Sequence, residues 1–545
     1  MKRNRLISLL CAIVLLATLV SLPVRAQELG TPLADVRVRQ ALAYAIDMDA
    51  IVESLFEGKA KTAISFTAPG DWLNAELPVY KYDPEKARAL LAEANWPADY
   101  TLDVVYYYGD QQTVDLMTII TEYWKEVGVK ANFRKLEGDL AAQLWTAPED
   151  HEKGPSAVKW DIAYGAVAAL VENEFYNRFS SAASNNSHTP KNAEMDALLA
   201  EAVSTIDIEA QKATYKKIQA LLAENVFALP LYHQVAFIYS SKDLDMKGNA
   251  VGNDQFSYEK NILDWTIARD DKTMYTNSGP EEFFHAPFIN PGNFIYQELV
   301  FDRLLNADPQ LTPTDGRMAE SFTVSEDSKT MEFVLREGLK WHDDTALTAE
   351  DVKFTFELIA KVPTANALIT DMVKSLEGAE VFIKGEAKEI SGIVVEGNKV
   401  TFKFEKVAAN ALPIFAQWPI LPKHLLEKAD PATIQQDQFW QKPIGSGPFK
   451  VDEVVLNNYS TLVRWDGYFK PGTGDIAKIH MFASGDNDTN LVKNASAGKI
   501  DYAWNKNTED AKAIEGLEHM KIDVADIRYT RCLYFNQFPH EANIK

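Results

Sequence analysis

The sequence predicts an α/β protein of two or three domains, on three observations. The chain has 545 residues, which is enough for more than one hydrophobic core. Residues 102–136 read as strand, helix and strand: LDVVYYY, then TVDLMTIITEYWKEV, which Gly128 ends, then VKANFRKL. Farther along, MEFVLREGLKW and VTFKFEK alternate apolar and polar residues as half-buried strands do. Such a mixture predicts helices layered on a sheet.

The amino-terminal segment has the composition of a secretion signal. Lys2, Arg3 and Arg5 precede an apolar run over residues 6–22, and VRA at residues 24–26 is a small-residue cleavage site. The apolar run also approaches the length of a membrane-spanning helix, so an uncleaved anchor is the alternative. Because the cleavage site favours removal, we expect a periplasmic or secreted protein.

The cysteines and the net charge limit the class of protein further. Cys11 lies in the leader, but it comes too early in the leader to be a lipoprotein cysteine and follows two leucines in place of small residues. Cys532 is then the one cysteine of the mature chain. A single cysteine forms no internal disulfide, so the fold relies on its hydrophobic core. The formal net charge of −23 disfavours nucleic acid and anionic membranes as partners. We interpret this acidity as a solubility feature in preference to a trap for cations.

Helix signals occur in order along the first half of the chain. Asp35 precedes a helical apolar stripe, which predicts a helix within residues 35–56. Asp83 and Pro84 predict the start of another, because aspartate caps a helix and proline suits its first position. A further helix is expected over residues 210–224.

Six segments carry a family resemblance. Near the amino terminus, ADVRVRQALAYAIDMD and YDPEKARALLAEAN, at residues 34–49 and 82–95, resemble C-terminal-half motifs of the family 5 extracellular solute-binding proteins, the dipeptide and oligopeptide receptors of ABC importers. The resemblance implies a two-lobed periplasmic-binding-protein fold of type II, in the large peptide-binding cluster. Motifs of the family's N-terminal half come later, as AESFTVSEDSKTMEFVLREGLKWHDDTALTAEDVKFTF, LPKHLLEK, PIGSGPF and YTRCLYFN, at residues 319–356, 421–428, 443–449 and 529–536.

Because the two sets of motifs stand in reverse order, we interpret the sequence as a circular permutant. In the family, a segment like YTRCLYFN runs through a short loop into one like RVRQALAYAID, which implies that Lys545 lies near Leu33. The former ends would meet within residues 265–275, where Arg-Asp-Asp-Lys joins two strand-like runs without a Gly/Ser linker. The sequence leaves open whether this order is natural, engineered or part of a longer chain.

The resemblance also divides the chain. After the signal peptide at residues 1–27, it implies a smaller α/β lobe at residues 28–225 and a larger lobe at residues 226–545. The larger lobe would include an extra subdomain at about residues 328–438. A single covalent crossing between the lobes is expected near residues 227–233, where other family members have two.

In the family the ligand lies between the lobes, where an acidic side chain of the smaller lobe holds a peptide's amino group. The corresponding residues 160–181 lack the usual aspartate before a proline, so Glu172 or Glu174 is the substitute, or both are solvated loop acids. A buried ammonium needs such a paired carboxylate. Asn536 is expected as a polar contact. Four aromatic residues are expected to face the cleft, where their rings could stack on peptide side chains or on sugar faces; the alternative is that they are core residues. They are Tyr164, Tyr176, Trp504 and Tyr534.

Catalytic and metal-binding motifs find little support in the sequence. It contains neither a G-x-S-x-G elbow nor an H-E-x-x-H pair, and its nine histidines are dispersed. His342, Asp343 and Asp344 occupy a turn in the family, which argues against a metal cluster. PIGSGPF lacks the lysine of a phosphate-binding loop. A glycosidase carboxylate pair stays open in so acidic a chain. The resemblance implies a protein that is not an enzyme, with no cofactor and no metal.

The sequence therefore predicts a monomeric receptor that captures a small solute and delivers it to an ABC permease. A short peptide is the favoured ligand. The permease would distinguish the closed lobes from the open ones. An oligosaccharide is the alternative ligand. A ligand sensor not coupled to transport is the alternative role, because it would use the same closed lobes.

Overall fold

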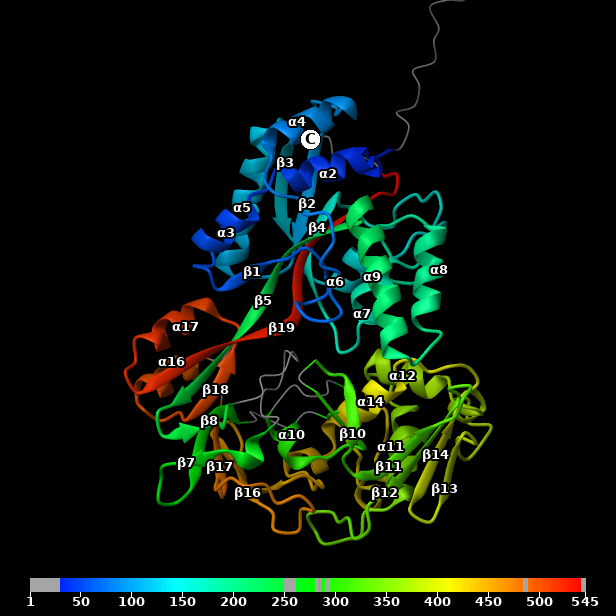
Figure 1. Cartoon of the computed structure of the whole chain (residues 1–545), viewed down its shortest axis with the longest axis vertical. Helices are drawn as coiled ribbons and strands as arrows, with labels where there is room; N and C mark the ends of the chain where they lie inside the picture. Colours follow the sequence, from blue (N-terminus) through cyan, green and yellow to red (C-terminus); the bar gives the residue numbers. More distant parts are fainter. Residues whose placement is uncertain are drawn as a thin grey trace, which may run out of the picture.

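The computed structural model describes residues 30–248, 261–279, 284, 286–289, 295–308, 310–483 and 489–540. In Figure 1 these residues form two lobes, joined by two long strands, β5 (Ala228–Ser241) and β19 (Met520–Phe535). The small lobe comprises the residues before β5 together with the end of β19, and the large lobe comprises the rest. The predicted signal segment lies outside the described residues. None of the described helices is both long and apolar enough to cross a membrane.

One sheet of eleven strands runs through both lobes, in the order β15-β16-β17-β8-β18-β5-β19-β4-β2-β3, with β1 paired to β5. In the small lobe β2 is parallel to β3 and β4. In the large lobe β8 is parallel to β17 and β18. The strands of this sheet not yet bounded are β1 (Ala60–Thr62), β2 (Thr101–Tyr106), β3 (Lys130–Lys135), β4 (Ile162–Ala168), β8 (Thr273–Gly279), β15 (Phe449–Val455), β16 (Tyr459–Arg464), β17 (Lys478–Ala483) and β18 (Tyr502–Asn505).

The expectation of a single crossing between the lobes is wrong, because β19 crosses as well as β5. The two strands pair antiparallel along most of their length, from Met520 opposite Ser241 to Tyr534 opposite Ala228. The last residues of β19 pack in the small lobe, where Leu533 shares a hydrophobic cluster with Leu33. The division of the chain at residue 225 stays a prediction, with the end of β19 belonging by its packing to the small lobe.

The small-lobe helices follow the predicted caps, with one correction. Asp35 and Asp83 accept hydrogen bonds from the amides of Arg37 and Lys86, both at 2.9 Å. The helix expected within residues 35–56 is two helices, because the side chain of Asp47 caps a second one. The small-lobe helices are η1 (Pro32–Ala34), α2 (Val36–Tyr44), α3 (Met48–Ser54), α4 (Pro84–Glu93), α5 (Gln111–Glu126), α6 (Leu140–Trp145), α7 (Asn173–Tyr176), η2 (Asn177–Phe179), α8 (Ala193–Ala202) and α9 (Ile208–Asn225).

The predicted strand, helix and strand of the small lobe are confirmed as β2, α5 and β3. Asp110 caps α5, and Trp124 near its end is fully buried, where its indole N–H donates to the Leu42 carbonyl at 3.1 Å. Helices pack on both faces of this part of the sheet, so the side chains of β4 and β19 divide between two clusters. Leu533 and Phe535 lie in one cluster, and Cys532 and Tyr534 lie in the other.

The large lobe contains a second sheet of four strands, in the order β11-β12-β14-β13. The capping box at the start of α11 is present, with Thr348 and Asp351 each bonded to the other's backbone. The remaining large-lobe elements are β6 (Leu244–Asp245), η3 (Ile262–Asp264), β7 (Thr266–Ile267), α10 (Ile295–Val300), β9 (Leu305–Ala307), β10 (Pro313–Gly316), β11 (Ala319–Val324), β12 (Thr330–Leu335), α11 (Ala349–Ile359), α12 (Ala367–Lys374), α13 (Ala379–Ile383), β13 (Ile393–Glu396), β14 (Lys399–Lys403), α14 (Ala411–Gln417), α15 (Lys423–Leu426), η4 (Ile434–Gln436), η5 (Gln438–Gln441), α16 (Asn490–Ser496) and α17 (Thr508–Glu515).

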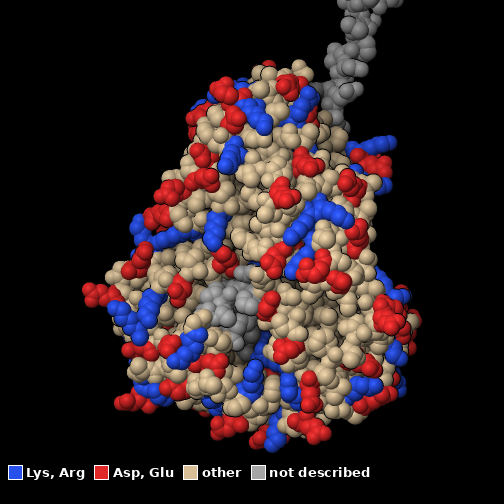
Figure 2. All heavy atoms as spheres, in the orientation of Figure 1, with Lys and Arg blue, Asp and Glu red and all other residues tan. Residues whose placement is uncertain are grey.

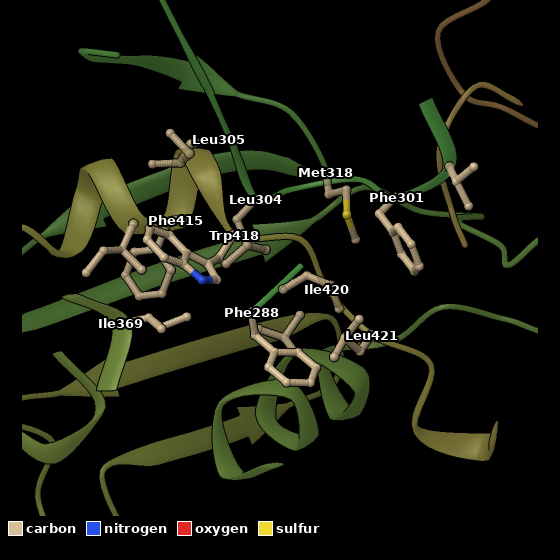
Figure 3. Close-up of a cluster of buried hydrophobic side chains, with 14 of the residues drawn as sticks. Phe288, Phe301, Leu304, Leu305, Met318, Ile369, Phe415, Trp418, Ile420 and Leu421 are labelled. Atoms are coloured by element: carbon tan, nitrogen blue, oxygen red, sulfur yellow. The ribbon is translucent and has the colours of Figure 1, made fainter. Parts of the chain in front are cut away.

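The segment predicted as an extra subdomain, residues 328–438, shares its core with the rest of the large lobe. Figure 3 shows Phe415 and Trp418 from this segment beside Leu304, which precedes it, and all three belong to one buried cluster. The four-stranded sheet is therefore a layer on the large lobe and has no separate core.

The predicted turn at residues 342–344 and the PIGSGPF segment pack together. Asp344 has φ 68°, a value that glycine adopts more readily. His342 bonds through Nδ1 to the Gly445 amide at 3.1 Å and through Nε2 to the Gly447 carbonyl at 2.9 Å. A Cβ on Gly445 would lie 1.8 Å from the Val300 carbonyl oxygen, so close backbone packing explains this glycine. Both motifs are thus architectural.

The first and last described segments lie side by side in the small lobe. Gly30 forms a β-bridge with His540. The Thr31 hydroxyl donates to the Asn536 carbonyl at 3.5 Å. Lys545 lies outside the described residues, so its predicted proximity to Leu33 stays a prediction.

Candidate functional site

The carboxyl ends of strands from both lobes converge on the two crossing strands. In the small lobe, β4 ends at Ala168, opposite Tyr529 of β19. In the large lobe, β18 ends at Asn505, opposite Phe237 of β5. In α/β sheets, ligands bind beyond the carboxyl ends of parallel strands. The region between the lobes is therefore the candidate site.

An arginine and four tyrosines form a cluster at this junction, comprising Arg531, Tyr108, Tyr164, Tyr232 and Tyr529. The Arg531 Cζ lies 3.8 Å from the ring centre of Tyr108 and 5.2 Å from that of Tyr529. Burial alone would lower the pKa of Arg531, but the tyrosine oxygens, that of Tyr164 foremost, hold it above its ordinary value. The cluster thus keeps a permanent cation beside aromatic faces.

The large lobe adds a second cation to this arginine–tyrosine cluster. Lys506 directly follows β18, and its Nζ lies 5.0 Å from the ring centre of Tyr529. The Gln234 side chain links the Arg531 guanidinium to the backbone of Lys506: its amide nitrogen donates to the Lys506 carbonyl at 3.3 Å, and its oxygen accepts from Arg531 Nη2 at 3.4 Å. Two cationic side chains, Arg531 and Lys506, thus lie beside the ring of Tyr529 at the junction between the lobes.

A cavity of about 90 Å³ lies between the lobes, near a buried ion pair. Arg528 of β19 donates to Glu172 Oε2 at 3.0 Å, and the two side chains are 7% and 3% exposed. Thr67 also donates to Glu172. Burial raises the pKa of Glu172, although Arg528 opposes this rise. The lining residues from the small lobe include Trp72, Leu170, Asn173 and Tyr215, and those from the large lobe include Leu311, Pro313, Phe322 and Leu412.

The structure gives the two predicted amine-binding acids partners of their own. Glu172 lines the cavity and is paired with Arg528. Glu174 accepts a hydrogen bond from the Leu170 amide at 2.6 Å, and burial raises its pKa. Neither is a solvated loop acid. Their predicted role toward a ligand ammonium stays a prediction.

The other predicted site residues are mostly interior. Tyr534 lies in the small-lobe core, where it accepts a hydrogen bond from Arg178 at 3.1 Å. Asn536 is fully buried and donates to the Trp160 carbonyl at 2.9 Å. Tyr176 is fully buried behind the cavity, 2.7 Å from the Thr67 hydroxyl. Trp504 is half-buried and packs against the large-lobe core. Tyr164 alone of these belongs to the arginine–tyrosine cluster.

Sequence reasoning did not single out Arg531, Arg528, Tyr108 or Lys506. A signal was available for the first. In YTRCLYFN the arginine occupies a position within a strand whose neighbours are mostly apolar, and a cation there requires a specific environment. Figure 2 shows acidic and basic side chains mixed over the visible face of both lobes, so surface charge gives no such indication.

Comparisons with known proteins identify the class and then the family. The arrangement of two α/β lobes about crossing strands is that of a solute-binding protein. The family model described as "Bacterial extracellular solute-binding proteins, family 5 Middle" matches residues 17–186 and 314–540, more than half of the chain. This chain belongs to that family, whose members are binding components of transporters and not enzymes.

Individual relatives match over shorter stretches. Heme-binding protein A of Haemophilus influenzae is 30% identical over 221 residues, 38% of each chain. The dipeptide-binding protein of Escherichia coli is 29% identical over 214 residues, 38% of this chain and 39% of that one. The oligopeptide-binding protein AppA of Bacillus subtilis, solved with a nonapeptide, is 23% identical with a TM-score of 0.35, covering 42% and 43% of the chains. The chain thus spans about two fifths of the length of the curated relatives it matches.

Proposed function

We propose that this protein is the extracytoplasmic receptor of an ABC importer, which captures a short peptide between its lobes and delivers it to a permease. Family membership supports a solute-binding role. Relatives named as dipeptide-, oligopeptide- and putative peptide-binding proteins support a peptide ligand.

The observation that carries the proposal is the cavity walled by both lobes. Its volume of about 90 Å³ is below the roughly 300–1,000 Å³ of ordinary ligand pockets. Admission of a peptide therefore requires the lobes to separate, and the two crossing strands are the natural hinge. Closure then changes the outer surface of both lobes, which is what a permease would sense.

The test is to identify what the protein binds. Ligands that survive purification would be released and identified by mass spectrometry, and the emptied protein would be mixed with a tripeptide mixture, an oligosaccharide mixture or haem, with thermal stability as the readout. Stabilisation by tripeptides supports the proposal. Stabilisation by oligosaccharides alone, or by haem alone, would transfer the assignment to that ligand.

We also propose that the chain order is a circular permutation of the family's order. The adjacency of Gly30 and His540 supports this, because a direct link between these segments would restore the family's usual connection. The former ends would have met in the turn between β7 and β8. There the Thr273 amide donates to Asp271 at 3.2 Å and Lys272 Nζ donates to the Ile267 carbonyl at 2.9 Å.

A further inference from the structure

We infer that Arg531 binds a carboxylate of the ligand, so that the interlobe site selects its solute by an anionic end. The inference rests on the proposed function, because it names the group of the captured peptide that the site recognises. A peptide supplies this carboxylate from its carboxyl terminus.

The guanidinium of Arg531 is only partly hydrogen-bonded within the protein. Nε and Nη1 of Arg531 are shielded from solvent and have no hydrogen-bond partner, and Arg531 is the one arginine of the described residues with two such nitrogens. Only Nη2 is engaged, at 3.4 Å from Gln234. Shielded donors without acceptors are costly to a fold, which makes them candidates for a ligand.

The surrounding tyrosines do not accept these bonds. Their hydroxyls pair with one another: Tyr164 with Tyr232 at 3.0 Å, and Tyr108 with Tyr529 at 3.3 Å. Tyr108 is also 2.8 Å from the hydroxyl of Tyr107. The rings of Tyr108 and Tyr529 therefore lie beside the guanidinium, while Nε and Nη1 keep their hydrogen-bonding capacity for a planar acceptor. A carboxylate is such an acceptor.

Three carboxylates of the neighbouring elements have other partners. Asp526 of β19 pairs with Lys61 at 2.5 Å. Asp110 caps α5, and Asp510 of α17 accepts from Asn505 at 2.6 Å. Among the described residues no acidic side chain lies within ion-pair distance of Arg531.

The electrostatic consequence follows from these pairings. Glu172, the acid lining the cavity, is already neutralised by Arg528. Among the described residues Arg531 thus has no acidic partner, which favours a ligand carboxylate over a ligand ammonium beside it.

The experiment uses three tripeptide mixtures: one with both termini free, one N-acetylated and one with C-terminal amides. Each is incubated with the protein, and the retained peptides are quantified by mass spectrometry after gel filtration. We expect the free and N-acetylated mixtures to be retained alike and the amides at least about tenfold less. Equal retention of amides by the wild-type protein would overturn the inference.

Variants locate the effect. Arg531→Met should lose at least about tenfold of the retained free-carboxylate peptides while its retention of amides is unchanged, and Arg531→Lys should keep part of the preference because it keeps the charge without the fork. Arg464→Met is the matched control, because Arg464 also stacks on a ring, that of Phe449 at 5.4 Å, and leaves Nη2 unpaired, but lies in the large-lobe sheet.

The outcomes separate this inference from the proposed function. If Arg531→Met does not fold, the wild-type comparison and Arg531→Lys decide, and a lysine variant with undiminished preference contradicts the inference. Loss of preference in Arg464→Met would also contradict it. Retention of no mixture by the wild-type protein would contradict peptide binding itself, whereas indiscriminate retention contradicts only the role of Arg531.

Discussion

Removing Arg528 should strongly destabilise the protein, because it leaves Glu172 buried without its cation. The two side chains are 7% and 3% exposed, and their 3.0 Å contact is the salt bridge of Glu172. Breaking a buried pair from one side costs about 3–5 kcal/mol, whereas replacing both members by apolar residues is often nearly neutral. We therefore expect Arg528→Met to lose about 3–5 kcal/mol in the free energy of unfolding. The double variant Glu172→Leu, Arg528→Met should recover at least half of that loss.

The loss should depend on pH in a defined direction. Burial raises the pKa of Glu172 above 4.5, so the native state holds this proton where the unfolded state has lost it. That contribution stabilises the fold at low pH and is lost as the pH rises through the native pKa. Arg528 lowers this pKa, so its removal raises the pKa of Glu172 further and extends to higher pH the range in which the native state holds the extra proton. Urea unfolding at about pH 5 and about pH 7.5 should therefore show the larger cost at the higher pH.

Two results would refute this reasoning. One is an Arg528→Met cost that is the same at both pH values, which would mean that an ionised Glu172 is not what destabilises the variant. The other is a double variant as unstable as the single one, because the coupling energy of the pair would then be close to zero.

Three further predictions test other parts of the structure. A chain rearranged to run from residue 272 to 545 and then from 29 to 271 should fold to the same structure as this chain, since both crossing strands stay intact. Small-angle scattering of the two unliganded proteins should agree, and a more open conformation of either one would contradict this. Burial lowers the pKa of His540, but its bond to Asp161 at 2.8 Å raises it above 6.5 overall, so its contribution is present at low pH and lost as the pH rises through that pKa. His540→Gln should thus cost more stability at about pH 5.5 than at about pH 8.5 in urea titrations, and equal costs would count against it. Cys532 is buried, which raises its pKa to about 12, so iodoacetamide should modify it only on unfolding; rapid labelling of the native protein would disprove this.

Local chemistry made much of the fold predictable. Asp35, Asp83 and the Thr348 capping box mark helix starts through bonds within three residues, so the sequence alone contains both partners. The failure at residues 35–56 has the same origin. The apolar stripe continues past Asp47, so the sequence was interpreted as one helix. The cap that begins the second helix, Asp47 bonded to the Ala50 amide, is equally local but was missed.

The candidate site was less predictable, because its contacts join distant segments. Glu172 and Arg528 are 356 positions apart, and nothing local to either indicates the other. Strand alternation in β19 places Arg531 and Leu533 on one face and Cys532 and Tyr534 on the other, but it does not say which face meets the ligand. Tyr534 was therefore expected at the cleft, although the packing places it in a small-lobe core cluster and places Arg531 beside Tyr108.

Under the proposed permutation, segment order and fold are separate properties of this protein. Gly30 and His540 are bridged within the small lobe, and the residues flanking Asp271 are held together within a tight turn of the large lobe. Joining the first pair or opening the second leaves β5, β19 and both cores unchanged. Because closing a short loop between adjacent ends costs little entropy, either order of segments is compatible with the same hinge. Under the proposed permutation the motif order reports on connectivity, while the convergence of strand ends on β5 and β19 positions the proposed ligand site.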